Sequence, residues 1–297
     1  LQNISTVAGV SNNVAEVWTA SDRAICSRDA RNLHCVGRLG SNTYASRHWV
    51  DLVNETDQLE CGAEHCCAFT LGSTNAVCIG DNTSNQGGGP DPNSPPSSIH
   101  PVQMTAPIRS MALGKTTSCA LTDQGVECWG SNQYAQYGND QLTGSGSPQI
   151  GIAAGDHNLT SLSAGGQRLF CGMNNRSWTC WGQFDEESNG FDAQGNPGQF
   201  GGYTQEPMTN PAGNPTLHLI ATDQYGACIV YGEDANNKSV GCAGVNRFGL
   251  IDVSGQRNDN QFTNWVETHR DVGDITSLAL HSGTGCLIAN GELKCWG

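Results

Sequence analysis

The sequence has few basic residues and no long apolar run. Its 297 residues include 14 lysines and arginines against 28 aspartates and glutamates, which gives a formal net charge of −14. Binding to nucleic acid or to an anionic membrane surface requires clustered lysine and arginine, so the composition argues against both kinds of partner. No stretch approaches the roughly 18 consecutive apolar residues of a membrane-spanning helix. The chain starts at Leu1 without a methionine or a basic-then-apolar leader, and we expect that a targeting segment has been removed.

Charged residues of both signs make up only 14% of the chain, whereas glycine alone occupies 38 positions. Asparagine, serine and threonine are also frequent. This composition is typical of short strands and tight turns rather than of helices. The chain is long enough to bury a substantial core.

Cysteine and N-glycosylation sequons are both abundant. The 14 cysteines are an even number, and cytosolic chains rarely carry so many unless they bind metal. Six Asn-x-Ser/Thr sequons accompany them, at Asn3, Asn54, Asn82, Asn158, Asn175 and Asn237. Together they predict a secreted, extracellular glycoprotein that carries N-linked glycans.

Twelve of the cysteines belong to six copies of one repeat unit. The clearest pair of copies is SCALTDQGVECWG, from Ser118 to Gly130, and GCLIANGELKCWG, from Gly285 to Gly297. The cysteine pairs of the six copies are Cys26 and Cys35, Cys67 and Cys78, Cys119 and Cys128, Cys171 and Cys180, Cys228 and Cys242, and Cys286 and Cys295.

Each copy predicts a strand followed by a hairpin that carries its two cysteines. Alternating apolar residues, as in Ile108–Leu113, indicate a strand with one buried face, and turn residues such as those of 123–125 separate the cysteines. Cysteines that face each other across a hairpin are close enough to form a disulfide. Two cysteines remain, and we expect Cys61 to pair with Cys66, with an exchange of roles between Cys66 and Cys67 as the alternative. Zinc is disfavoured because its cysteine ligands usually stand two to four residues apart in groups of four.

These repeats resemble those of the regulator of chromosome condensation family, which are β-propeller blades. The resemblance rests on Gly114–Gly138 (GKTTSCALTDQGVECWGSNQYAQYG), on GAEHCCAFTLGSTNAVCIGDN from Gly62 and on Ser277–Gly297. It implies an all-β propeller of about six blades, with seven as the alternative because well-known members have seven. The tryptophans of the CWG motifs (Trp129, Trp181 and Trp296) are expected to pack between blades rather than to stack on sugar rings.

The order of the repeats predicts one propeller domain over residues 1–297. Its units lie near 10–50, 51–104, 105–155, 156–213 and 214–271, and the last combines 272–297 with 1–9. In this arrangement the segment Gln2–Gly9 supplies the outer strand of the final blade and closes the ring, since an open sheet edge is a pairing hazard. The alternative is donation of this strand to the next molecule, which would produce a filament.

No catalytic constellation emerges from the sequence. None of the eight histidines forms an HExxH pair, and a structural role is expected for His65 and His281 before the repeat cysteines. The run from Gly87 to Ser98 lacks the lysine of a phosphate loop, and the acidic groups at 185–187 and 233–234 are expected to be solvated loops. We therefore predict a protein that is not an enzyme, with no metal and no cofactor.

Two functions remain in view. The first is a secreted structural or adhesive glycoprotein whose partner is itself, in a homo-oligomer or filament. The alternative is a soluble binding module, lectin-like or inhibitor-like, that holds an extracellular protein or glycan with the long loops 80–101, 184–203 and 252–265.

Overall fold

The structure is a computed structural model. It describes residues 16–20, 24–28, 32–39, 42–51, 58–89, 91–93, 98–138, 145–153, 158–166, 168–183, 206–207, 210–234, 236–246, 249–251 and 262–297. The description covers only the backbone in residues 16–51, 145–153, 206–207 and 262–264. The regular structure of the described residues is all β, and neighbouring strands pair antiparallel.

The strands form six small sheets, numbered here in chain order. The first sheet consists of β1 (Glu16–Ala20), β2 (Ala24–Arg28), β3 (Asn32–Leu39) and β4 (Asn42–Asp51). The second consists of β5 (Gln58–Cys61), β6 (His65–Phe69), β7 (Asn75–Gly80) and β8 (His100–Gln103). The third consists of β9 (Ile108–Leu113), β10 (Thr117–Thr122), β11 (Gly125–Gly130) and β12 (Ser145–Ala153).

The remaining three sheets repeat the same order. The fourth consists of β13 (Ser161–Gly165), β14 (Leu169–Met173), β15 (Trp178–Gly182) and β16 (Glu206–Pro207). The fifth consists of β17 (Leu217–Thr222), β18 (Gly226–Tyr231), β19 (Lys238–Val245) and β20 (Phe262–Gly273). The sixth has three strands in the described part of the chain, β21 (Ile275–His281), β22 (Thr284–Ala289) and β23 (Glu292–Trp296).

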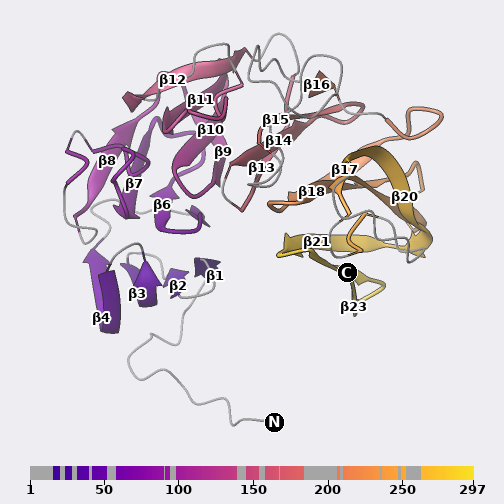
Figure 1. Cartoon of the computed structure of the whole chain (residues 1–297), viewed down its shortest axis with the longest axis horizontal. Helices are drawn as coiled ribbons and strands as arrows, with labels where there is room; N and C mark the ends of the chain where they lie inside the picture. Colours follow the sequence, from indigo (N-terminus) through magenta and orange to yellow (C-terminus); the bar gives the residue numbers. More distant parts are fainter. Residues whose placement is uncertain are drawn as a thin grey trace.

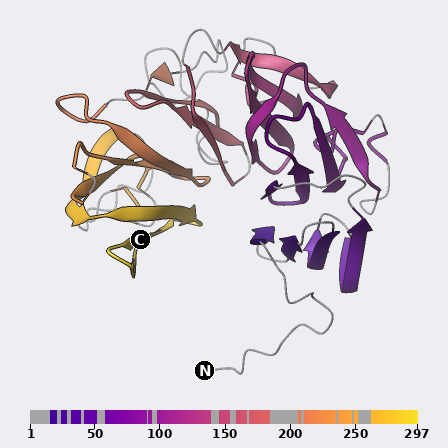
Figure 2. The same cartoon turned by 180° about the vertical axis from the view of Figure 1, so that it is seen from behind.

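The six sheets follow one another around an arc (Figure 1). The first strand of each sheet lies innermost, and β1, β5, β9, β13, β17 and β21 contact one another in that order. The same arc seen from behind places the first sheet and the sixth sheet at its two ends (Figure 2). This is the blade arrangement of a β-propeller, as the repeats predict. The predicted closing strand Gln2–Gly9 lies outside the described residues.

The hydrophobic core lies in the seams between successive sheets. Between the third and fourth sheets, for example, Leu121 and Val126 pack against Phe170 and Trp181. Corresponding clusters fill the seams on either side. Because each hairpin buries apolar residues on both of its faces, β10 and β11 are buried at every position. The core of this protein is therefore divided among the contacts between neighbouring sheets, whereas an ordinary globular domain has a single central core.

The backbones of successive sheets approach each other closely at two glycines, Gly62 and Gly165. A side chain on Gly165 would stand 2.2 Å from the carbonyl oxygen of Asp223, and one on Gly62 would stand 2.1 Å from that of Gly114. Glycine is required at these two positions because no side-chain carbon tolerates such contacts with backbone.

A recurring loop follows the third strand of the second, third and fifth sheets and precedes the fourth strand of the same sheet. We name it the asparagine loop, and it is defined by Asn82 with Gln86 and Gly87, Asn132 with Gln136 and Tyr137, and Asn246 with Leu250 and Ile251. In each copy the asparagine Oδ1 accepts a hydrogen bond of 2.8–3.0 Å from the amide five residues later. The residue three after the asparagine has a positive φ, and it is Asn85, Ala135 or Gly249. The loop is thus an internally bonded turn that positions the carbonyl of its fifth residue.

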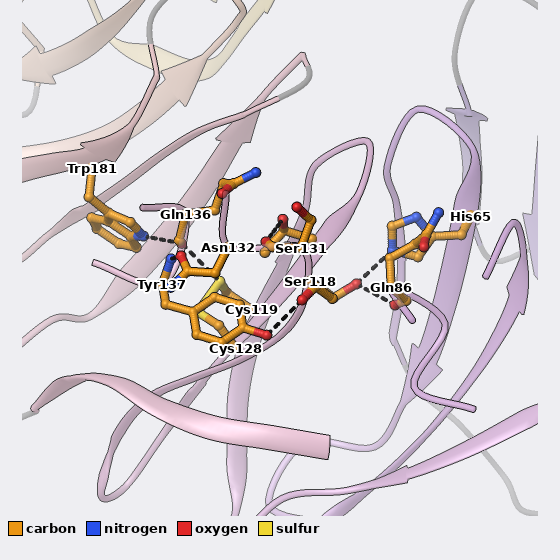
Figure 3. Close-up of a disulfide and its surroundings, with 12 residues drawn as sticks. His65, Gln86, Ser118, Cys119, Cys128, Ser131, Asn132, Gln136, Tyr137 and Trp181 are labelled. Atoms are coloured by element: carbon orange, nitrogen blue, oxygen red, sulfur yellow. Dashed lines mark hydrogen bonds between the residues drawn. A yellow bond between two sulfur atoms is a disulfide. The ribbon is translucent and has the colours of Figure 1, made fainter. Parts of the chain in front are cut away.

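That carbonyl holds the tryptophan of the next sheet. The indole Nε1 groups of Trp129, Trp181 and Trp296 donate hydrogen bonds of 2.8–3.0 Å to the carbonyls of Gln86, Gln136 and Leu250. Figure 3 shows this arrangement around Gln136 and Trp181. The tryptophans therefore lie at the seams, as the sequence predicts.

Candidate functional site

The two cysteines of each repeat lie directly opposite each other in the hairpin register. Cys119 pairs with Cys128, Cys171 with Cys180, and Cys286 with Cys295, and each pair forms a disulfide. Cys67–Cys78 and Cys228–Cys242 follow the same rule. The structure also contains Cys61–Cys66, so the ambiguity over Cys66 and Cys67 is resolved in favour of the first assignment. The Cα register pairs Cys26 with Cys35, but their side chains lie outside the described residues.

The hairpin disulfide of each repeat belongs to one face of its sheet, which we call the trailing face, whereas Cys61–Cys66 lies in the adjacent row of the second sheet and belongs to the opposite face. The trailing face is defined by the two cysteines, by the residue two positions after the first cysteine and by the residue two positions before the second, because alternate residues of a strand share a face. In the second to fifth sheets the two non-cysteine positions are Phe69 and Ala76, Leu121 and Val126, Met173 and Trp178, and Val230 and Val240. All eight side chains are at most 4% exposed, because the next sheet covers them.

The trailing face of the sixth sheet is uncovered. Its two defining positions are Ile288, which is 38% exposed, and Leu293, which is 71% exposed. The Cys286–Cys295 disulfide between them is also accessible, since Cys295 is exposed and Cys286 only partly buried. In the described part of the chain no fourth strand pairs with β23, so its outer edge is open as well. This face therefore combines exposed apolar side chains with unpaired strand backbone.

The opposite face of the sixth sheet is packed. Leu287 is buried and contributes to the core shared with the fifth sheet, and the Trp296 indole is bonded to Leu250. Asp223 of the fifth sheet, which is buried, accepts a 2.7 Å hydrogen bond from the amide of Gly283 in the β21–β22 turn. Burial raises the pKa of the Asp223 carboxyl, and the amides of Gly283, Tyr225 and Gly226 oppose that rise. The sixth sheet is thus anchored on one side only.

The sequons fall into three groups. Asn158, Asn175 and Asn237 are exposed, whereas Asn3 and Asn54 lie outside the described residues. Asn82 is 1% exposed, and its Nδ2 donates to the carbonyls of Gly89 and Asp91 while its Oδ1 accepts from Gly87. A glycan on Asn82 would replace one of its amide hydrogens and would have no room. We therefore propose that the glycan-bearing set excludes Asn82.

Two of the polar groups singled out by the sequence, His65 and Glu233, have structural partners, and His281 is exposed at the end of β21. His65 is buried between the second and third sheets, and its Nε2 lies 2.6 Å from the Ser118 Oγ (Figure 3). Glu233 is exposed and accepts hydrogen bonds from Thr216, which lower the pKa of its carboxyl, as does the nearby Arg176. Within the described residues no group of three or more histidine, cysteine or acidic side chains is placed to hold a metal ion. The acidic group at 185–187 and the loop 184–203 lie outside the description, as do residues 252–261 of the third predicted loop.

No helix in the described part of the chain has the length and apolar character needed to cross a membrane.

The two apolar positions of this face are recognisable in the sequence, although their exposure is not. Ile288 and Leu293 occupy the same repeat positions as residues that are buried in the four preceding sheets. Alignment of the copies by their cysteines is sufficient to find these two positions, whereas their exposure is a property of the packing around the sixth sheet.

No protein-family model matches the chain, and no curated protein matches it. Solved structures do. Human WBSCR16 superimposes with a TM-score of 0.69 at 15% identity, over 95% of this chain and 76% of that one. Prp20p from Saccharomyces cerevisiae, described with its binding to Gsp1p and histones, superimposes with a TM-score of 0.65 at 17% identity. The match covers 93% of this chain and 70% of that one. The CRINKLY ectodomain of the Arabidopsis thaliana receptor kinase ACR4 superimposes with a TM-score of 0.54 at 17% identity. The match covers 93% of this chain and 77% of that one.

These likenesses establish the fold. The protein has a β-propeller fold similar to that of the regulator of chromosome condensation, with disulfides added within its hairpins. At these levels of identity they carry nothing about activity or partners. The six disulfides among the described side chains are typical of proteins that fold in an oxidising compartment.

Proposed function

We propose that this protein is a secreted, non-enzymatic glycoprotein with a structural or adhesive extracellular role, and that copies of it assemble with one another. The observation that carries the proposal is the uncovered trailing face of the sixth sheet, where Ile288 and Leu293 stand exposed beside an open strand edge. A stable monomer rarely combines exposed apolar side chains and an unpaired edge on one sheet, because both favour association. Residues 1–297 are taken as a single propeller domain.

Two further features support an extracellular setting. Disulfides persist outside the reducing cytosol, and the described side chains form six of them. Three sequons, at Asn158, Asn175 and Asn237, are exposed and accessible to a glycan. The polar groups described above are committed to structural hydrogen bonds rather than gathered around a reacting centre, which supports a role exerted through surfaces.

The test is to express residues 1–297 in a eukaryotic secretion system and to examine the secreted protein by negative-stain microscopy and sedimentation. The proposal expects glycosylated protein in the medium that forms oligomers or fibres as concentration rises. Dispersed single discs at every concentration would contradict self-assembly and favour a soluble binding module, for which a glycan array is the next assay. Retention of reduced protein inside the cell would contradict the extracellular role.

A further inference from the structure

The three exposed sequons stand on one rim of two neighbouring sheets. Asn175 lies in the β14–β15 turn of the fourth sheet, and Asn237 lies in the β18–β19 turn of the fifth. Asn158 precedes β13, and the amide of Thr160 in the same sequon donates a 2.8 Å hydrogen bond to the carbonyl of Met173, where β14 ends. Asn158 therefore stands beside the turn that contains Asn175. We call this surface the sequon rim, and it is defined by residues 158–160, 174–177, 214–217, 232–234 and 236–237.

Main-chain hydrogen bonds join the two turns across the seam between the sheets. The carbonyl of Asn175 accepts a 2.9 Å bond from the amide of Leu217, the first residue of β17. The carbonyl of the preceding residue, Thr216, accepts a 2.9 Å bond from the amide of Gly232, which begins the turn that contains Asn237. A continuous run of bonded backbone thus extends from one turn to the other, so the sites keep fixed relative positions.

Side chains bind the same two turns to each other. The Arg176 Nη1 donates a 2.6 Å hydrogen bond to the carbonyl of Asn214 and forms an ion pair with the Glu233 Oε1 at 3.3 Å. Glu233 also accepts bonds of 2.8 and 3.1 Å from the amide and the hydroxyl of Thr216. An exposed ion pair alone contributes little to stability, but here it accompanies the main-chain bonds. Because Arg176 belongs to the fourth-sheet sequon and Glu233 to the β18–β19 turn, the surface between the two sequons is held from both sheets.

The sites are close enough for one partner to reach them together. Neighbouring strands of a sheet lie about 4.8 Å apart, and only β17, β18 and β19 separate the two turns, so the three asparagines fall within about 20 Å. The corresponding turns of the second, third and sixth sheets, 70–74, 123–124 and 290–291, contain no sequon. The sequons of the described hairpin turns are therefore gathered on two sheets that are neighbours in the arc (Figure 1).

From this placement we infer that N-glycans on Asn158, Asn175 and Asn237 form one cluster, and that the cluster is the docking surface for a multivalent glycan-binding protein. The inference rests on the proposed function, because it requires a secreted and glycosylated chain, and it names the partner of the adhesive role. Once one glycan is bound, binding of the next by the same partner is intramolecular, and such linkage raises the overall affinity by about 10²- to 10⁴-fold. This gain requires that one partner reaches two sites together, which the sequon rim provides.

The experiment uses the chain secreted from cells that leave N-glycans in the high-mannose form. In every chain Asn3→Gln and Asn54→Gln remove the two sequons that lie outside the described residues. The probe is a mannose-binding lectin trimer with its sites on one face, and the reference probe is its single carbohydrate-recognition domain. The three-glycan chain is compared with Asn158→Gln, Asn175→Gln, which retains one glycan. We expect the trimer to bind three glycans about 100-fold more tightly than one, and the single domain to differ only about threefold, the ratio of glycan numbers.

A matched control tests the spacing of the glycans rather than their number. Leu71 is 49% exposed in the β6–β7 turn, and Leu71→Asn completes a sequon with Ser73. Asn158→Gln leaves a neighbouring pair of glycans, whereas Asn158→Gln, Asn175→Gln with Leu71→Asn leaves a pair on the second and fifth sheets. We expect the trimer to bind the neighbouring pair about tenfold more tightly. Peptide mapping verifies which sites carry glycans, and thermal unfolding verifies that each variant is folded.

Equal affinity of the trimer for the two pairs overturns the inference, while the glycosylated state in the proposed function stands. If position 71 carries no glycan, the comparison of three glycans with one decides, and a trimer ratio equal to that of the single domain overturns the inference in the same way. Absence of glycans from all three asparagines of the secreted chain contradicts the glycoprotein of the proposed function together with the cluster.

Discussion

The indole Nε1 of Trp129, in the third sheet, donates a 2.8 Å hydrogen bond to the main-chain oxygen of Gln86, in the asparagine loop between β7 and β8 of the second sheet. The same oxygen also accepts the hydroxyl of Ser118. The two donors come from neighbouring strands of the third sheet, so one carbonyl joins a loop to a hairpin. Two further seams repeat the tryptophan bond.

Substitution of Trp129 by phenylalanine should lower the free energy of unfolding by about 1–3 kcal/mol. The change removes the indole N–H from a fully buried seam and leaves unfilled volume behind. Guanidinium unfolding of the secreted chain measures the effect, and Leu71→Ala serves as a surface control expected to change stability by less than about 0.5 kcal/mol. Equal stabilities of the tryptophan and phenylalanine forms would contradict this account of the seam.

Acidification should destabilise the protein through His65. Ser118 has one hydroxyl hydrogen, which it donates to Gln86, so the neutral His65 donates from Nε2 to the Ser118 oxygen. Its buried Nδ1 has no hydrogen-bond partner among the described residues, and a proton there would bury a charge. Burial lowers the pKa of His65 from 6.5 to about 3. The unfolded chain therefore binds the proton first, and stability is fully present above 6.5 and falls as the pH drops toward 3.

The measurement is the unfolding free energy at about pH 7 and about pH 4 for the unchanged chain and for His65→Gln. The glutamine does not titrate and retains an amide donor, so the variant should lose about 3 kcal/mol less on acidification. Identical losses in the two proteins would show that His65 is not the group responsible.

Mild thiol reductants should open Cys286–Cys295 before the other seam disulfides. Thiol–disulfide exchange requires access to a sulfur atom, and Cys295 is exposed, whereas Cys119 and Cys128 are fully buried. Differential alkylation followed by mass spectrometry, at a dilution that keeps copies apart, gives the order. The two hairpins have the same cysteine separation of nine residues, so Cys119–Cys128 is a matched comparison. Its reduction at the same rate would indicate that the third sheet opens as readily as the sixth.

Enzymatic release of N-glycans in heavy-oxygen water should label Asn158, Asn175 and Asn237 but not Asn82. The first three are exposed, whereas the Asn82 amide is buried and bonded inside its loop. Asn132 makes the same Oδ1 bond in the next copy without a sequon, which indicates that this asparagine is selected for its turn. Peptide mapping identifies which asparagines carry the heavy-oxygen label. A label on Asn82 in folded protein would contradict the buried, hydrogen-bonded position of its amide.

The hairpins were predictable because their contacts are local. The alternation in Ile108–Leu113 predicts a strand that the structure contains with the same bounds, and cysteine spacing with an intervening turn predicts the Cys119–Cys128 register. The predicted end of a strand differs from the observed one where the apolar alternation continues beyond the residues that pair with the neighbouring strand. The apolar pattern before Cys171 begins at Leu159, for instance, and predicts a strand from that residue, but β13 begins at Ser161 and the buried Leu159 packs into the seam from outside the strand.

The bonds between sheets were not predicted, although one regularity in the chain reflects them. An asparagine stands four residues after Cys78, Cys128 and Cys242, and the next sheets are those with a tryptophan after their second cysteine. Leu39 and Phe184 occupy the corresponding positions of the other two loops, and the sheets that follow carry Ile79 and Ala243 instead of tryptophan. A loop and its tryptophan lie more than 40 residues apart, and composition or periodicity in a short window does not connect them.

The amino-acid sequence by itself determined the repeat, the all-β class and the pairing of cysteines within hairpins, because each depends on residues a few positions apart. The tertiary structure alone decided which faces are covered. Ile288 and Val230 occupy equivalent places in their repeats, yet one is exposed and the other is buried. The difference arises because a sheet face is buried only when a neighbouring sheet packs on it, and the position of a sheet in the arc is a property of the whole chain.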